Sequence, residues 1–252
     1  MSGKRKFAIV CWLMDIPQDV GLIAIAGQQT EGKGRGGNAW LSPVGCAMFT
    51  LYLQLPLNSA LGERICFLQH LMALSVVESV RTLSGYQDVD LRLKWPNDIY
   101  YKDQVKIGGV LLRSSLMGST YTVMIGCGFN VSNSSPTLCI NELVRRLNQD
   151  QSETLPELQI EQLMGRSITL LEKFIEEFQN QGPEALLNRY YSRWLHSGVS
   201  VRLQSEDGPE ALVLGLDDSG FLQVMSDQGV VSLQPDGNSF DMMKNLLVIK
   251  PR

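Results

Sequence analysis

The chain has 252 residues, of which 44% are hydrophobic and 19% charged, as expected for a globular protein that buries a sizeable core. Its net charge of −4 argues against nonspecific binding to nucleic acid, so we expect no DNA partner. Residues 1–150 carry 14 basic and 11 acidic side chains, whereas residues 151–252 carry 8 and 15, so an anionic small molecule would bind more favourably in the first part.

The cysteines and histidines exclude several kinds of site. Five scattered cysteines without a C-x-x-C pair indicate a reducing compartment (cytoplasm, mitochondrion or nucleus) and argue against secretion and structural zinc. The only histidines are His70 and His196, too few for a histidine-ligated metal or a Ser-His-Asp triad. We expect both to be structural.

The N-terminal segments predict strands. The basic residues Lys4–Lys6 precede an apolar run, Phe7–Met14, that is too short to span a membrane and has no small-residue cleavage site. We expect this run and Leu22–Ala26 to form buried strands, the second of which leads into a glycine-rich loop.

That loop, Gly32–Gly37, has four glycines in six residues, with Lys33 and Arg35 between them. Glycine allows positive φ angles and close approach of the backbone to a ligand. Two cations and several backbone N–H groups on one short loop favour binding of a phosphate or carboxylate. A flexible surface turn is the alternative.

Alternating apolar and polar residues predict a sheet after this loop. A strand over 48–55 ends at Pro56, and an amphipathic helix is predicted over 63–83 from apolar residues three and four apart. Further strands are predicted over 91–95, 97–101, 106–115 and 120–127. The short turns between them indicate an α+β fold with a mixed, largely antiparallel sheet and helices on one face.

In the rest of the chain, the predicted elements change near His196 from helices to short strands. Helices are predicted from residue 141 and over 160–181 and 184–195. Short strands with glycine turns follow over 199–203, 211–216, 221–225, 230–233 and 246–249, and predict a small β-barrel of about five strands. We therefore expect a catalytic domain over 1–196 and a C-terminal domain over 197–252.

Common nucleotide motifs do not fit. The glycines of the loop match G-x-G-x-x-G, but a dinucleotide site needs a helix directly afterwards, and here Pro43 and a strand follow. The phosphate-loop and protein-kinase motifs are absent from the sequence. Two other stretches place cations beside stiff or small residues: Lys94-Trp95-Pro96-Asn97-Asp98 and Lys106-Ile107-Gly108-Gly109.

Taken in order, these stretches resemble one family. The glycine loop with Trp40, the stretches 94–98 and 106–109, and Gly126-Cys127-Gly128-Phe129-Asn130-Val131 are similar to the motifs of biotin–protein ligases. Residues 41–46, 97–101 and 236–242 resemble the corresponding sequences of vertebrate members. The resemblance runs from about Gly21 to the C-terminus.

The resemblance implies a two-step reaction. Biotin and ATP, with Mg²⁺, would give biotinyl-5′-adenylate and pyrophosphate, and the biotinyl group would pass to a lysine in the biotin carrier domain of a carboxylase. The cations would offset the repulsion between two anionic substrates, and Asp98 would orient the incoming amine or take its proton.

The resemblance also implies the site residues. Lys106, Arg35 and Asp98 would be catalytic. Biotin would be bound by Gln29, Gly32, Lys33, Gly34, Arg35, Trp40, Lys106, Gly108 and Gly109. ATP would be bound by Lys33, Arg35, Lys94, Trp95, Asn97 and Asn130. Magnesium would enter with the ATP phosphates, near Asn130, without a site built from protein ligands alone.

The chain departs from the family at its N-terminus. Members carry a further strand and helix with a Ser/Thr-Thr segment before the glycine loop, and residues 4–20 do not resemble it. We therefore expect an N-terminally incomplete catalytic domain. Two alternatives stay open: a lipoate-transferring relative, against which the stretch 94–98 argues, and a weakly active or inactive module that binds biotin or a carboxylase.

Overall fold

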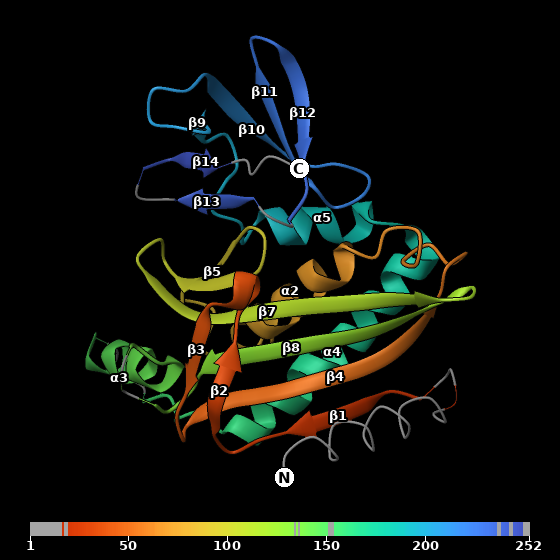
Figure 1. Ribbon diagram of the computed structural model, residues 1–252. Coiled ribbons are helices and arrows are strands. Elements are labelled where there is room, and N and C mark those ends of the chain that lie inside the picture. The colour runs from red at the N-terminus through yellow and green to blue at the C-terminus, as the bar shows by residue number, and fades with distance from the viewer. Residues whose placement is uncertain are drawn as a thin grey trace.

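A six-stranded antiparallel sheet forms the centre of the protein (Figure 1). The computed structural model describes residues 17, 20–133, 135, 137–150, 154–235, 238–241 and 244–248, so the predicted strand Phe7–Met14 lies outside the described residues. The strand order is β1-β4-β8-β7-β6-β5. The strands are β1 (Leu22–Ile25), β4 (Cys46–Pro56), β5 (Leu91–Lys94), β6 (Asp98–Tyr101), β7 (Val105–Met117) and β8 (Thr120–Asn130).

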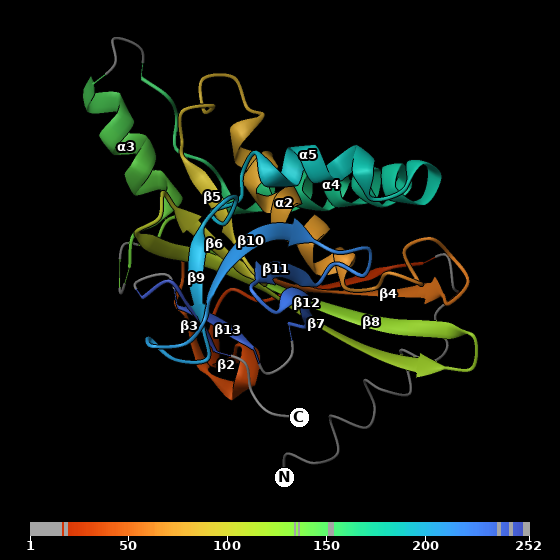
Figure 2. The same cartoon turned by 90° about the horizontal axis from the view of Figure 1, so that it is seen from above.

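The helices cover one face of this sheet. In Figure 2, α2, α4 and α5 lie on one side of β4, β7 and β8, and the β2–β3 hairpin lies on the other. The helices are α2 (Phe67–Arg81), α3 (Ile140–Asp150), α4 (Ile160–Gln181) and α5 (Glu184–Tyr191). This arrangement confirms the predicted α+β fold with helices on one face.

The long strands alternate between the two faces, as β-strands do. On β8, Val123 and Ile125 are fully buried in the core, whereas Met124 between them is 41% exposed. The same strands therefore supply core packing on the helix side and leave the other side available for a ligand.

Helix α2 is the central element of the core. A helix lies within the predicted range, but every residue from Phe67 to Val80 is buried, so its predicted amphipathic character was wrong. The polar side chains are buried because they find partners: Glu78 pairs with Arg193 at 2.8 Å, and Gln69 bonds backbone groups of Pro96 and Leu112. Sequence periodicity alone could not reveal these partners.

A second sheet forms the C-terminal part. Its strands are β9 (Ser200–Leu203), β10 (Glu210–Leu216), β11 (Leu222–Ser226), β12 (Gly229–Leu233), β13 (Ser239–Asp241) and β14 (Leu246–Val248). Their order is β12-β11-β10-β9-β14-β13, and β14 pairs with β9 in parallel. The prediction of about five strands missed β13, whose three residues are too few to give a reliable alternation signal. Among the described residues, the end strands β12 and β13 do not pair, so the sheet is not a closed barrel there.

The two parts share one core. Val201, Leu222 and Phe240 of the C-terminal sheet belong to the same buried cluster as the residues of α2 and β8. The backbone N–H of Leu216 donates to the hydroxyl of Tyr191 at 2.8 Å, and the rings of His196 and Phe240 lie 4.3 Å apart. The domain boundary near 196 stays a prediction, and any two domains divided there are tightly joined.

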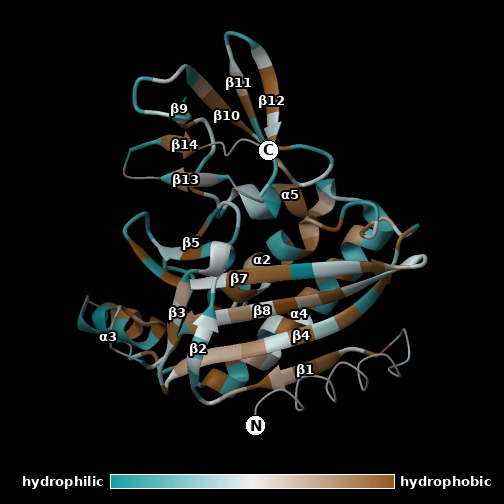
Figure 3. Ribbon diagram, viewed as in Figure 1, coloured by the Kyte–Doolittle hydropathy of each residue, from teal (hydrophilic) through white to brown (hydrophobic). Residues whose placement is uncertain are grey.

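Two features near the N-terminus differ from expectation. The hairpin of β2 (Gln29–Lys33) and β3 (Ala39–Ser42) replaces a simple loop. Strand β1 exists but is exposed along its length, because it lies at the sheet edge and pairs only with β4 in the part of the chain that is described. Apolar residues reach the surface at β1 and again at β12 (Figure 3). Separately from these N-terminal features, none of the helices that the structure describes is both long enough and apolar enough to cross a membrane.

Candidate active site

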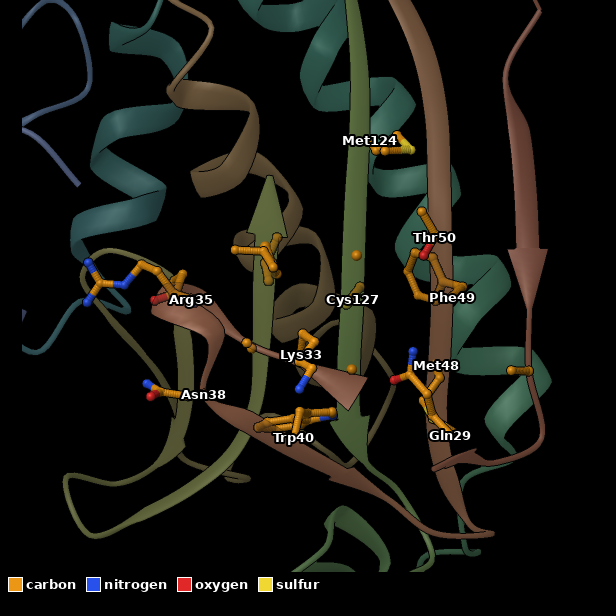
Figure 4. Close-up of a pocket in the computed structure, with 18 of the residues that line it drawn as sticks. Gln29, Lys33, Arg35, Asn38, Trp40, Met48, Phe49, Thr50, Met124 and Cys127 are labelled. Carbon is orange, nitrogen blue, oxygen red and sulfur yellow. The ribbon is translucent and has the colours of Figure 1, made fainter. Parts of the chain in front are cut away.

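A cavity of about 610 Å³ lies between the β2–β3 hairpin and the sheet face that the helices leave uncovered (Figure 4). Its lining combines apolar and polar groups from β1, β4, β6, β7 and β8 with the hairpin above them. Of the predicted site residues it includes Gln29, Lys33, Gly34, Arg35, Trp40, Asn97, Asp98, Lys106 and Gly109. Residues far apart in the sequence thus meet in one place.

Glycines form the floor of the cavity, where the lack of side chains leaves room for a ligand. Gly109 of β7 lies directly opposite Gly128 of β8, and Gly126 lies on the same face two residues before Gly128. A Cβ atom on Gly128 would lie 2.8 Å from Nε1 of Trp40, closer than real contacts allow. The indole therefore packs against backbone, and a ligand can approach the strands closely.

A partly exposed ion pair lies at the end of this floor. Nζ of Lys106 lies 2.7 Å from Oδ1 of Asp98, and the Asp98 side chain is only 17% exposed. The same Nζ lies 5.3 Å from the centre of the Trp40 ring, a distance at which a cation is attracted to an aromatic face. Lys106 is therefore held in position by a carboxylate and an indole.

The turn before Asp98 is held in place by a side chain of α2. The amide of Gln69 donates to the carbonyl of Pro96 at 3.0 Å and accepts from the backbone N–H of Leu112 at 3.1 Å. One side chain of α2 thus joins the turn before Asp98 to strand β7. Sequence reasoning missed Gln69, because it predicted a polar outer face for that helix.

The hairpin places Lys33 over the cavity. Lys33 is exposed and lies near Trp40 in Figure 4. Gly32 is buried, and a Cβ there would lie 2.4 Å from the carbonyl oxygen of Trp40, so the two strands can close only on glycine. Gly32 contributes to hairpin geometry and does not line the cavity.

Arg35 points away from the ion pair. Its guanidinium donates to the backbone carbonyls of Pro235 and Asn238 in the C-terminal part. In Figure 4 the guanidinium is directed away from Lys33 and Trp40. Arg35 lines the cavity with the rest of its side chain. A contact between its guanidinium and a ligand over the cavity floor would require this side chain to turn.

The stretch 94–97 divides between core and site. Trp95 is 1% exposed and lies in the core, and it does not line the cavity. Lys94 also lies outside the lining, with Nζ 5.4 Å from the Tyr100 ring, and burial lowers its pKa despite the nearby Asp98. Asn97 alone of the three predicted ATP contacts in this stretch lines the cavity.

Two further predicted residues lie outside the cavity. The amide of Asn130 donates to Thr137 at 2.7 Å and accepts from Asn133 at 2.9 Å, so it holds the loop after β8. A predicted contact of Asn130 with ATP or its metal has no support in this geometry. Gly108 faces the core, where a Cβ would lie 2.7 Å from Cβ of Phe129.

Other lining residues were not predicted. They include Glu31 and Asn38 of the hairpin region, Thr50 of β4, Arg113 of β7 and Met124 of β8. A signal for Arg113 existed, because Gly109, Leu111 and Arg113 share one face of a strand with a period of two. For Glu31 there was none, since its direction depends on an irregularity between Gln29 and Gly32 in the hairpin.

Both histidines are buried and bonded, as predicted. His70 donates from Nε2 to the carbonyl of Gly220 at 2.9 Å, and burial lowers its pKa to about 4. His196 accepts at Nε2 from the backbone N–H of Trp95 at 2.9 Å, and burial lowers its pKa to about 3. Neither lines the cavity.

Comparison with known families agrees with this geometry. Residues 14–130, which contain the hairpin, the ion pair and the glycine floor, match the Biotin/lipoate A/B protein ligase family. Residues 196–244 match the Biotin protein ligase C terminal domain. The two family models thus match separate parts of the chain.

Comparison with individual proteins shows which ligases within this family the chain resembles. Human biotin–protein ligase is 56% identical over 241 residues, which are 95% of this chain and 33% of that protein. Biotin–protein ligase 2 of Arabidopsis thaliana is 33% identical over 237 residues, 90% of this chain and 69% of that protein. The chain belongs to the biotin–protein ligase family, and it spans a third of the length of the human relative.

The fold matches as well. The structure of biotin protein ligase from Aquifex aeolicus in complex with biotin and ATP superposes with a TM-score of 0.66 and 22% identity, over 88% of this chain and 89% of that one. This likeness supports the α+β fold with its C-terminal sheet.

Proposed function

We propose that this chain is an active biotin–protein ligase. It would activate biotin with ATP to biotinyl-5′-adenylate and transfer the biotinyl group to a lysine in the carrier domain of a biotin-dependent carboxylase. The observation that carries the proposal is the Lys106–Asp98 pair, held under Trp40 at the end of a glycine-floored cavity.

The first step brings two anions together. The biotin carboxylate must attack the α-phosphate of ATP, and cations lower the cost of that approach and stabilise the charge that grows in the transition state. Lys106 is suited to this role because it is fixed before the substrates arrive, and Lys33 adds a second cation from the hairpin. The glycine floor allows the substrates to lie against the backbone.

Magnesium does not fit a site made by the protein alone. Among the described residues, no three His, Cys, Asp or Glu side chains gather where they could hold a metal. Asp98 is already paired with Lys106. Mg²⁺ commonly keeps several waters and binds through substrate phosphates, so it would enter with ATP.

The second step needs a neutral amine. The carrier lysine arrives protonated near neutral pH and must lose a proton to a carboxylate before it attacks the acyl carbon. The adenylate must meanwhile be kept from water, which the hairpin would do by closing over it.

A single incubation tests the proposal. The protein is mixed with ATP, labelled biotin and a carrier domain, and mass spectrometry follows adenylate formation and lysine modification; labelled lipoate replaces biotin in a parallel reaction. We expect adenylate, pyrophosphate and a biotinylated lysine. Binding of biotin without adenylate would instead favour an inactive binding module, and preference for lipoate would favour the lipoate-transferring alternative.

The compartment is part of the same proposal. The four described cysteines, Cys46, Cys66, Cys127 and Cys139, form no disulfide, which fits a reducing compartment such as cytosol or mitochondrial matrix. Cell fractionation with an antibody against the chain tests it, and recovery in the secreted fraction would contradict it.

A further inference from the structure

We infer that Glu31 receives the ammonium group of the acceptor lysine and takes its proton during transfer. This inference rests on the proposed function and divides the work of the two steps between two carboxylates. It concerns the part of the cavity that the hairpin lines.

Among the described residues that line the cavity, Asp98 and Glu31 are the two carboxylates. Asp98 is largely buried and lies 2.7 Å from Nζ of Lys106. If it bound a second ammonium, it would weaken its hold on the cation that the first step needs. Asp98 is therefore better placed to position Lys106 than to accept a proton from an incoming amine.

Glu31 has the opposite surroundings. It is exposed on β2, lines the cavity, and makes no ion pair with any residue that the structure describes. Glu31 and Lys33, both on β2, line the same cavity. An exposed carboxylate in the cavity lining can attract an ammonium without first breaking another ion pair.

The transfer step balances with Glu31 as proton acceptor. The lysine gives a proton to the Glu31 carboxylate, and its nitrogen lone pair forms a bond to the acyl carbon of biotinyl-adenylate. The bond from that carbon to the phosphate oxygen breaks, and AMP leaves with the electron pair. The second proton of the nitrogen and the proton on Glu31 pass to water, leaving an amide and an ionised carboxylate.

The experiment separates the two steps by supplying synthetic biotinyl-adenylate to the full chain. Transfer is measured to a carrier domain and, separately, to hydroxylamine, a small amine that is uncharged at neutral pH. Glu31→Gln should slow transfer to the carrier at least tenfold, while its reaction with hydroxylamine and its formation of adenylate change less than twofold. Glu31→Asp should restore part of the rate.

Two comparisons sharpen the result. Carrier transfer by Glu31→Gln should recover as pH rises, because more of the lysine is then neutral, and Asp98→Asn should instead slow adenylate formation. Glu172→Gln, on the exposed side of α4, serves as the matched control and should behave as wild type. Equal loss with hydroxylamine, or unchanged transfer to the carrier, would overturn the inference. Failure of the wild type to make adenylate would count against the proposed function alone, since transfer is measured with supplied adenylate.

Discussion

The two faces of the central sheet are built from the same strands and do different work. On the helix face, Ile125 is fully buried against the core, whereas its neighbour Met124 on the cavity face is 41% exposed. On the helix face, side chains fill the space between sheet and helices. On the cavity face, glycines leave space free of side chains. Stability and ligand binding therefore depend on alternate residues of one strand, and substitutions can separate them.

The largest expected effect is on the helix face. Ile125→Ala should lower the free energy of unfolding by about 2–5 kcal/mol, because it leaves a cavity in a close-packed core. Denaturant unfolding measures it. Met124→Ala is the control on the same strand and should cost under about 1 kcal/mol while raising the KM for biotin. Similar losses of stability for both variants would contradict the division between the faces.

Lys106→Ala tests the cavity face. Loss of a preorganised cation should slow adenylate formation by about 10²–10³-fold, with thermal stability nearly unchanged. Pyrophosphate release measures the rate, and transfer from supplied adenylate should fall less. If both half-reactions slowed equally, Lys106 would not act chiefly on the first step.

A pair of glycines sharpens the comparison further. A Cβ on Gly108 would meet Phe129 and the carbonyl of Gly128, which cannot move easily, so Gly108→Ala should destabilise the fold by about 1–3 kcal/mol. Gly128→Ala would displace the Trp40 indole instead, and should raise the KM for ATP with a smaller loss of stability. Thermal melts and initial rates distinguish the two, and reversed outcomes would refute the assignment of faces.

Arg35→Gly tests the hairpin. It removes the bonds to Pro235 and Asn238 as well as a cation near the cavity, so the hairpin should close less well over the adenylate. We expect release of adenylate to rise about tenfold, with biotin appearing on bystander lysines in a lysate blot. Unchanged selectivity in that blot would show that the hairpin does not retain the intermediate.

A further effect concerns pH and accumulates over several pH units. His70 and His196 are neutral when buried, with pKa values lowered to about 4 and about 3, whereas in the unfolded chain each binds a proton near pH 6.5. Since the unfolded state binds more protons between these values, stability should fall as pH drops below about 6.5, by roughly 1 kcal/mol per pH unit for each histidine. Urea unfolding from pH 7 to 4 measures it, and His70→Asn should flatten the slope.

Much of the fold and part of the site could be predicted from the sequence. Alternation and turn residues located the long strands, since those signals are local. The burial of α2 and the exposure of β1 could not be predicted, because they depend on which elements pack against them. The glycine motifs located the cavity, but the position of Asn130 outside its lining could not be predicted, because its amide is bonded within a loop whose partners no spacing reveals.

The continuous core across the junction near His196 has a practical consequence for protein engineering. A chimera that received the C-terminal sheet of another family member would lose the bond from His70 to Gly220 and the contact of His196 with Phe240, unless both sides were exchanged together. A crossover at the turn Asp217–Gly220 should therefore be poorly tolerated, because Gly220 is buried and bonded to His70, whereas exchange of the whole junction as one block should succeed more often.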